Sequence, residues 1–192
     1  MHSRANAVRI IGGTYRGKKL SFPSIEGLRP TTDRIRETLF NWLMHDIRNA
    51  RCLDAFAGSG ALGFEAYSRG AAKVVLIEKN PAVCHHLQQI AASFMTPQLT
   101  VIQASAIEWL TAQKTNHQQQ FDVVFIDPPF ANLALFQCIQ LFEQSSLLIE
   151  GGLLYLESPH DLNLDLRFWH LLKSKKTGQV TYALYQKKSL PI

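Results

Sequence analysis

Long apolar segments are missing from this sequence of 192 residues. The longest apolar runs, such as residues 123–126 and 147–149, are far too short to cross a bilayer. The chain starts with a polar, basic stretch after Met1 and shows no apolar core of a secretory signal. We therefore expect a cytoplasmic protein that makes no use of a membrane.

Cysteine is also scarce, which argues against a disulfide framework and a cysteine-based metal site. Cys52, Cys84 and Cys138 are odd in number, far apart and without any C-x-x-C spacing. His85 and His86 are adjacent, so on a helix they point in different directions rather than at one metal ion. We expect reduced, structural thiols and no bound metal.

Repeats and low-complexity tracts are absent as well, apart from a polar run at residues 116–120 that indicates a surface loop. A hydrophobic content of 46% supports one packed core. The length suits a single domain with a small addition. We expect an extension at residues 1–50, followed by a catalytic domain at residues 51–192.

The charge of the chain is unevenly distributed around its net value of +5. Residues 1–51 hold ten Lys or Arg against four Asp or Glu, and residues 161–192 hold six against two. Residues 52–160 reverse the balance, with four basic against nine acidic side chains. A basic head and tail around an acidic middle indicate a polyanion-binding surface beside a separate pocket.

The predicted elements begin with a short hairpin and a helix. Residues 8–11 and 18–22 predict the two strands of the hairpin. A helix is expected at about residues 34–45, with Asp33 as its cap.

From residue 51 onward, strands and helices alternate. Strands are expected at residues 52–56, 73–78, 99–103, 121–126 and 153–157, and helices at 61–69, 81–94, 107–112 and 133–144. Such alternation predicts an α/β fold with a parallel sheet covered on both faces. Residues 167–173 and 179–186 predict an antiparallel hairpin at one edge of that sheet.

A glycine-rich loop follows the first strand of this region. Gly58, Gly60 and Gly63 match the G-x-G-x-x-G pattern, which by itself does not separate NAD from S-adenosylmethionine. Asp54 on the strand and Glu78 at the end of the next strand favour S-adenosylmethionine, since an acid can face its amine or its ribose. The candidate cofactor-binding residues are Asp54, Phe56, Ala57, Gly58, Ser59, Gly60, Glu78, Lys79, Ser105 and Ala106. Ser105 offers a hydroxyl at the position where enzymes that use S-adenosylmethionine often have an acid that recognises adenine.

The fourth strand ends in the tetrapeptide Asp127-Pro128-Pro129-Phe130, our candidate catalytic motif. An exocyclic base amine is a poor nucleophile because its lone pair is delocalised. Asp127 and the carbonyl of Pro128 can accept hydrogen bonds from this amine, while Pro129 stiffens the loop. Phe130 offers an aromatic face to an unstacked base. A dehydrogenase has no need of this motif, so we expect an aminomethyltransferase acting on nucleic acid.

These motifs resemble those of the bacterial 16S ribosomal RNA guanine-N2 methyltransferase family (ribosomal small subunit methyltransferase D). The matching stretches are Arg9-Ile10-Ile11-Gly12-Gly13 with Arg16-Gly17, residues 29–37 and 39–41, residues 54–60 and 127–130, and Gly178-Gln179-Val180 with Tyr185. The resemblance covers nearly the whole chain, and residues 29–41 are its most specific part.

By this resemblance the fold is the Rossmann-like class I S-adenosylmethionine-dependent methyltransferase fold, with seven strands and a small N-terminal extension. The implied reaction is methylation of the N2 amine of one guanine in 16S rRNA, presented on a partly assembled small subunit. The resemblance places Asp54, Phe56, Gly58, Gly60 and Glu78 around the cofactor. It places Asp127, Pro128 and Phe130 around the target amine.

Basic residues near the N-terminus are the candidates for contacts with RNA. The full set is Arg9, Arg16, Lys18, Arg29, Thr31, Arg34 and Arg36. Arg34 and Arg36 are two apart on a helix, so they point in different directions. For any one residue on the hairpin, a simply solvated side chain is an equally good interpretation. A monomer is the default expectation.

Three alternatives remain open from the sequence. A DNA methyltransferase acting on adenine N6 or cytosine N4 uses the same chemistry, although this chain has no evident target-recognition domain. A nicotinamide-dependent oxidoreductase would use the glycine loop but lacks an obvious catalytic pair. A non-catalytic RNA-binding module is disfavoured by the intact motif at residues 127–130.

Overall fold

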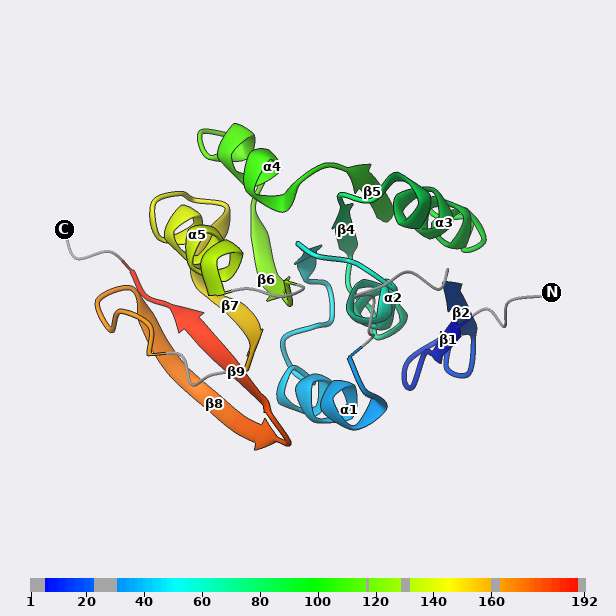
Figure 1. The fold of residues 1–192 in the computed structure, drawn as a ribbon, viewed down its shortest axis with the longest axis horizontal. Coiled ribbons are helices and arrows are strands. Elements are labelled where there is room, and N and C mark those ends of the chain that lie inside the picture. Colours follow the sequence, from blue (N-terminus) through cyan, green and yellow to red (C-terminus); the bar gives the residue numbers. More distant parts are fainter. Residues whose placement is uncertain (1–5, 23–30, 117, 129–131, 160–162, 190–192) are drawn as a thin grey trace.

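The computed structural model describes residues 6–22, 31–116, 118–128, 132–159 and 163–189. They form a small two-stranded sheet and a seven-stranded sheet with the order β5-β4-β3-β6-β7-β9-β8 (Figure 1). The small sheet is an antiparallel hairpin of β1 (Asn6–Arg9) and β2 (Lys19–Phe22). It confirms the hairpin predicted near the N-terminus.

The large sheet contains five neighbouring parallel strands and an antiparallel pair at one edge. The parallel strands are β3 (Arg51–Asp54), β4 (Lys73–Glu78), β5 (Leu99–Gln103), β6 (Phe121–Ile126) and β7 (Leu148–Ser158). The edge is formed by β8 (Trp169–Thr177) and β9 (Val180–Lys187), where β9 runs antiparallel to both neighbours. The strand order reverses between β3 and β6. Open α/β sheets bind ligands at such a switch point, beyond the carboxyl ends of the strands.

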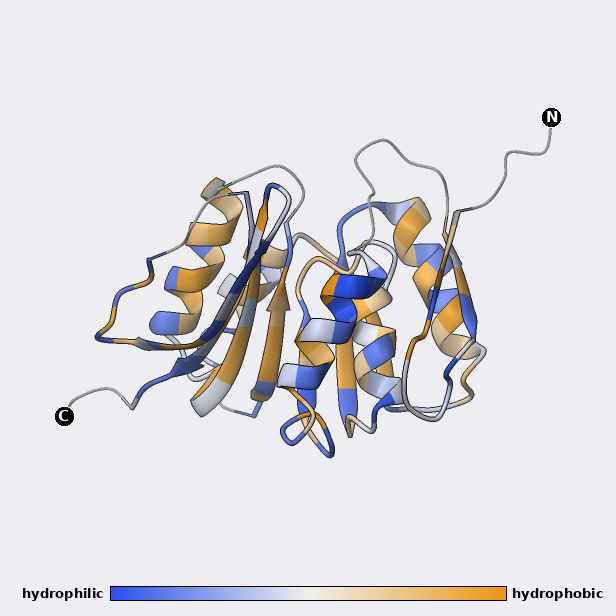
Figure 2. Cartoon of the chain, turned by 90° about the horizontal axis from the view of Figure 1, so that it is seen from below, coloured by the Kyte–Doolittle hydropathy of each residue, from blue (hydrophilic) through white to orange (hydrophobic). Residues whose placement is uncertain are grey.

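Helices cover both faces of this sheet, as predicted. On one face lie the hairpin, α1 (Asp33–Trp42), α2 (Ala61–Ser68) and α3 (Pro81–Ala92), and on the other lie α4 (Ala106–Gln113) and α5 (Asn132–Glu143). Each face has its own cluster of buried apolar side chains, and the central strands between them are strongly hydrophobic (Figure 2). No helix within the described residues is both long and apolar enough to span a membrane.

Local chemistry explains where the helices begin. The cap of α1 is Thr32, whose side chain accepts a hydrogen bond from the Ile35 amide. The prediction of Asp33 as the cap is therefore wrong by one residue, and Asp33 lies in the first turn. Asn80 caps α3 by accepting from the amides of Ala82 and Val83.

Strand β7 is longer than predicted. It begins at Leu148, which pairs with Phe121, and an irregularity in the register separates this pair from the regular ladder that starts at Leu153. Two glycines interrupt the apolar pattern at residues 151 and 152. This is why the sequence indicated only the second half of the strand.

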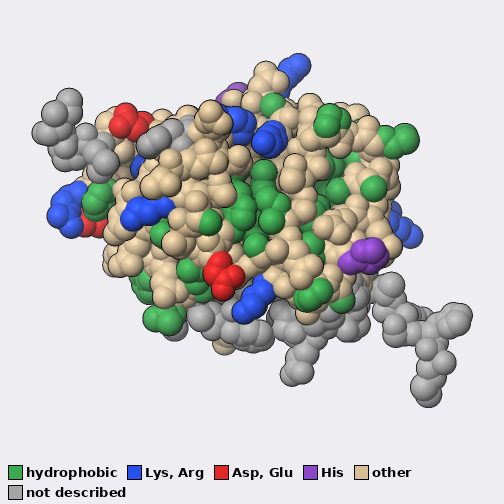
Figure 3. All heavy atoms as spheres, turned by 90° about the horizontal axis from the view of Figure 1, so that it is seen from above, with side chains coloured by type: hydrophobic (Ala, Val, Ile, Leu, Met, Phe, Trp, Pro, Cys, Tyr) green, Lys and Arg blue, Asp and Glu red, His purple; other side chains and the backbone are tan. Residues whose placement is uncertain are grey.

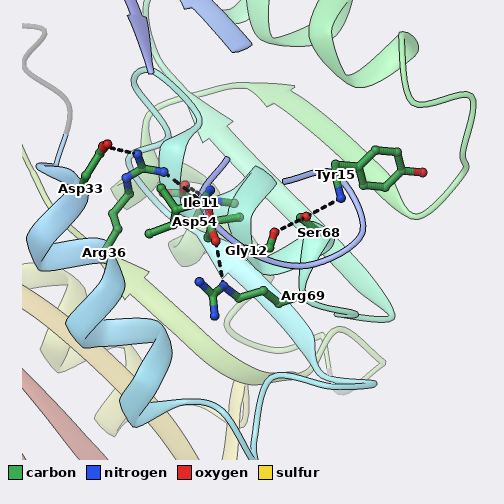
Figure 4. Close-up of polar contacts among 10 residues, drawn as sticks. Ile11, Gly12, Tyr15, Asp33, Arg36, Asp54, Ser68 and Arg69 are labelled. Carbon is green, nitrogen blue, oxygen red and sulfur yellow. Dashed lines mark hydrogen bonds and ion pairs between the residues drawn. The ribbon is translucent and has the colours of Figure 1, made fainter. Parts of the chain in front are cut away.

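The loop between β1 and β2 packs against the end of α2. The Thr14 amide donates to the Ser68 carbonyl over 2.8 Å, and the Tyr15 amide donates to the Ser68 hydroxyl over 2.9 Å. That hydroxyl in turn donates to the Gly12 carbonyl over 2.6 Å (Figure 4). Much of the sequence shared with the resembled family around residues 9–17 thus has a structural role.

A buried carboxylate, Glu65 on α2, ties three elements together. Its Oε2 accepts from the Ile11 amide at 2.8 Å and from Arg36 Nη1 at 3.4 Å, and its Oε1 accepts from Arg69 Nε at 2.7 Å. Arg36 also donates to Asp33 over 2.6 Å (Figure 4). The side chains of Arg36 and Glu65 are both 0% exposed. The guanidinium of Arg36 is thus enclosed and already paired, which argues against the predicted contact with RNA.

Candidate active site

Four adjacent strands each have an acidic residue at or next to their carboxyl end, at the same edge of the sheet. In spatial order these are Glu78 on β4, Asp54 on β3, Asp127 directly after β6, and Glu157 on β7. The register places all four side chains on the face covered by α1 and α2, since Asp54 pairs with both Leu76 and Phe125, and Phe125 pairs with Tyr155. The carboxyl edge is thus lined by acids.

Asp54 organises the start of α2. Its side chain is buried, and Oδ2 accepts a hydrogen bond from the Gly63 amide at 3.0 Å. Burial raises the pKa of Asp54 to about 7, although the Gly63 amide opposes this, and the negative charges of Asp127 and Glu78 raise it further. The carboxyl group therefore keeps its proton to a higher pH than an exposed aspartate does.

Glu78 holds the other side of the glycine loop. Its Oε2 accepts from the Gly58 amide at 3.0 Å, and its Oε1 accepts from the Asn80 amide at 2.7 Å. Gly60 has a φ of 76°, and a Cβ there would lie 2.4 Å from the Phe64 ring. Only glycine suits this position without displacing the core. The loop is thus a close backbone turn fixed by two carboxylates.

The remaining candidate cofactor residues surround this loop and the end of β5. Ala57, Ser59 and Ala106 are buried, Phe56 and Ser105 are half-buried, and Lys79 is exposed. Ser105 precedes α4, yet its side chain makes no capping hydrogen bond. Its assignment to adenine stays a prediction.

Asp127 lies at the junction of the sheet and the N-terminal segment. Thr31 Oγ1 donates to Asp127 Oδ2 over 3.2 Å, a contact between residues 96 positions apart. Burial raises the pKa of Asp127 to about 6, and the hydrogen bond from Thr31 opposes the rise. Pro128 follows at the surface of the sheet edge, half-buried. Pro129, Phe130 and also Arg29 lie outside the described residues.

Glu157 is the residue that the sequence analysis missed. It is 9% exposed, and the Tyr155 hydroxyl donates to its Oε1 over 2.9 Å. Burial raises the pKa of Glu157 to about 8, followed by the negative charge of Asp127, while hydrogen bonds from Tyr155 and Thr31 oppose the rise. The available signal was an acid at the end of an apolar strand in a parallel sheet, where functional residues gather.

The candidate RNA-binding residues are more dispersed. Arg9, Arg16 and Arg34 are exposed, whereas the Lys18 ammonium lies 4.1 Å from the centre of the Phe94 ring. On the face shown in Figure 3, lysine and arginine side chains stand singly or in small groups around a central hydrophobic area. That face presents no continuous basic surface among the described residues.

Comparisons with known proteins place this arrangement in a family. The profile described as "Conserved hypothetical protein 95" matches residues 8–186. The chain belongs to this family. A relative from Escherichia coli strain K12 named "Ribosomal RNA small subunit methyltransferase D" is 45% identical over 98% of this chain and 94% of its own length. A relative of the same name from Haemophilus influenzae is 46% identical over 93% of each chain.

Solved structures agree with the fold. The Escherichia coli protein yhhF superimposes with a TM-score of 0.86 and 45% identity, over 96% of this chain and 99% of that one. The Thermus thermophilus 16S rRNA N2 G1207 methyltransferase RsmC, solved with AdoMet and guanosine, has a TM-score of 0.67 and 22% identity over 97% of this chain and 50% of that one. At that identity the second likeness shows the fold alone. The class I methyltransferase fold predicted from the sequence is confirmed.

Proposed function

We propose that this protein transfers the methyl group of S-adenosylmethionine to the exocyclic N2 amine of a guanine in 16S rRNA. The observation that carries the proposal is the meeting of two motifs at one sheet edge. The glycine loop after β3 and Asp127 after β6 belong to neighbouring strands, at the point where the strand order reverses. The names of the two relatives above supply the ribosomal RNA.

The electrostatics of the edge favour a cationic cofactor over a dinucleotide. The charges of Asp127 and Glu78 both raise the pKa of Asp54, so added negative charge is unfavourable there. A pyrophosphate would add such charge, whereas a sulfonium and an ammonium would relieve the repulsion. Asp54, Glu78 and the amides of the loop are the groups that would hold S-adenosylmethionine. When bound, it supplies a methyl group activated by a positive sulfur. The acids thus argue against the nicotinamide-dependent alternative.

The side chains and backbone of this protein need to position the amine and accept hydrogen bonds from it. Asp127 is fixed by Thr31, at the end of a strand whose position is set on both sides by β3 and β7. Held in this way, its carboxylate and the Pro128 carbonyl can orient the amine lone pair toward the methyl group. Proximity and orientation are then the main sources of acceleration.

The remaining parts of the proposal concern the partner and the setting. We infer that residues 1–50 form the RNA-contacting extension, with Arg9, Arg16 and Arg34 available for phosphates because they are exposed. We also infer that the substrate is a small-subunit particle, and that the protein acts as a monomer in the cytoplasm. The salt dependence of particle binding, compared between wild type and Arg16→Ala, measures one phosphate contact.

The proposal is tested by incubating the protein with methyl-labelled S-adenosylmethionine and small subunits that lack the modification. Digestion to nucleosides is expected to give label in N2-methylguanosine, strongly reduced by Asp127→Asn, which preserves the size of the side chain. Label in N6-methyladenosine or N4-methylcytidine would preserve the reaction type and refute the substrate. Absence of S-adenosylmethionine binding would refute the reaction itself.

A further inference from the structure

A polar cluster, partly buried, extends from Asp127 away from the glycine-rich loop. Glu157 lies on β7 beside Asp127, because the register pairs Ile126 with Leu156 one position earlier. Tyr155 precedes Glu157 by two residues on the same face and donates to it over 2.9 Å. Thr31, in front of α1, closes the cluster through its hydrogen bond to Asp127.

The cluster continues into strand β9. Tyr182 is the register partner of Glu157, and its ring is covered by Trp42 of α1 at 5.4 Å between centroids. The Tyr182 hydroxyl is buried and has no hydrogen-bond partner among the described residues. An unpaired buried hydroxyl costs free energy. Its position across from Glu157 marks this side of the cluster as polar rather than as ordinary core.

We propose that Glu157 is a positioning residue for the methyl transfer, which acts from the neighbouring strand end on the Asp127 carboxylate that Thr31 also contacts. The inference rests on the proposed function, since it assigns a role within the same reaction. Glu157 acts through Asp127 and need not touch the substrate itself.

The physical reason is that two carboxyl groups at adjacent strand ends, Glu157 buried and Asp127 half-buried, do not readily ionise together. The pKa of Asp127 is raised to about 6 and that of Glu157 to about 8. Four groups face Glu157: Asp127 directly after β6, Tyr155 from its own strand, Tyr182 from β9, and Thr31 from the segment before α1. The higher pKa of Glu157 places the proton of the pair on Glu157 rather than on Asp127.

A consequence follows at alkaline pH. Above about pH 8 Glu157 loses its proton. Its negative charge then repels the Asp127 carboxylate instead of helping to position it. Turnover is expected to fall there even though Asp127 stays ionised. Glu157→Gln keeps a neutral side chain of the same shape at every pH, so this fall is expected to disappear.

The experiment measures kcat and the Kd for S-adenosylmethionine from pH 5.5 to 9 for the wild type, Glu157→Gln and Glu157→Ala. Glu157→Gln is expected to keep kcat within about threefold at pH 7 and to lose the alkaline fall. Glu157→Ala is expected to lose at least tenfold in kcat with an unchanged Kd. Glu150→Gln, at an exposed position on the same strand, is the matched control and should reproduce the wild-type profile.

The proposal is overturned if Glu157→Gln is as impaired as Glu157→Ala, or if it retains the alkaline fall. A carbon-13 NMR titration of the carboxyl groups tests the pair without any turnover. Glu157 is expected to titrate near pH 8 in the wild type and at lower pH in Asp127→Asn; titration below pH 6 in the wild type would also overturn the proposal. If the proposed function fails instead, the wild type transfers no methyl group at any pH while the titration stays as expected.

Discussion

Replacing Glu65 by alanine would leave Arg36 buried without its buried partner. Both side chains are 0% exposed, and Glu65 also accepts hydrogen bonds from the Ile11 amide and from Arg69. Breaking a buried ion pair by removing one member costs about 3–5 kcal/mol. Asp33 remains as a partner of Arg36, but it is 65% exposed and is screened by water, so we expect it to compensate little.

Urea unfolding of the wild type and Glu65→Ala measures this loss directly. Glu108→Ala, an exposed position on α4, is the control and should change the free energy of unfolding by no more than about 0.5 kcal/mol. Hydrogen exchange should show the largest loss of protection in the hairpin, where the Ile11 amide loses its acceptor.

A double variant separates the charge from the packing. Arg36→Met combined with Glu65→Leu removes both buried charges while keeping apolar volume, and should recover more than half of the loss seen in Glu65→Ala. The reasoning is refuted if Glu65→Ala costs less than about 1 kcal/mol, since the buried charge would then not depend on its partner.

Three further predictions concern the loop, the cofactor and the sheet edge. In thermal unfolding, Gly13→Ala should destabilise the protein clearly more than Gly17→Ala. Both glycines have positive φ, but only a Cβ at Gly13 would meet a backbone atom, the Ser68 carbonyl oxygen at 1.9 Å. Equal losses would contradict the packing described for this loop. The pKa of Asp54 is raised to about 7, so this carboxyl group is protonated at pH 5.5 and largely charged at pH 7.5. Calorimetry should therefore find that the preference for S-adenosylmethionine over S-adenosylhomocysteine, the product with an uncharged sulfur, increases over this range. A preference independent of pH, or one unchanged in Asp54→Asn, would count against the acidic edge as the cation site. Lys187→Met should lower the free energy of unfolding in urea by about 2–4 kcal/mol, because the buried ammonium donates to the carbonyls of Phe142, Ser145 and Leu148. A loss below about 1 kcal/mol would show that these carbonyls find other partners.

The sequence predicted the alternating strands because their apolar residues are buried from both faces. Strands β4, β5 and β6 have the predicted limits, and the terminal hairpin forms the sheet edge as expected. The glycine-rich turn after β3 was also identifiable, since Asp54 and Glu78 stand at fixed places relative to the glycines. These signals are local, so they are visible in one stretch of sequence.

The parts that sequence reasoning missed depend on contacts between distant residues. Arg36 looked like a surface cation because nothing in its neighbourhood reveals that Glu65 lies against it, 29 residues later in the chain. Glu157 becomes a candidate only once the strand order is known, because that order places β7 directly beside β6. Thr31 was assigned to RNA from its neighbourhood, and its hydrogen bond to Asp127 indicates a role in positioning that carboxylate.

The most direct test of the central claim is made in cells that lack the endogenous methyltransferase activity. The wild-type chain and Asp127→Asn are expressed at equal levels, and N2-methylguanosine in 16S rRNA is quantified by mass spectrometry. We predict that the wild type restores the modified nucleoside and that Asp127→Asn restores less than about a hundredth as much. Full restoration by Asp127→Asn would contradict the assignment of the active site to the end of β6.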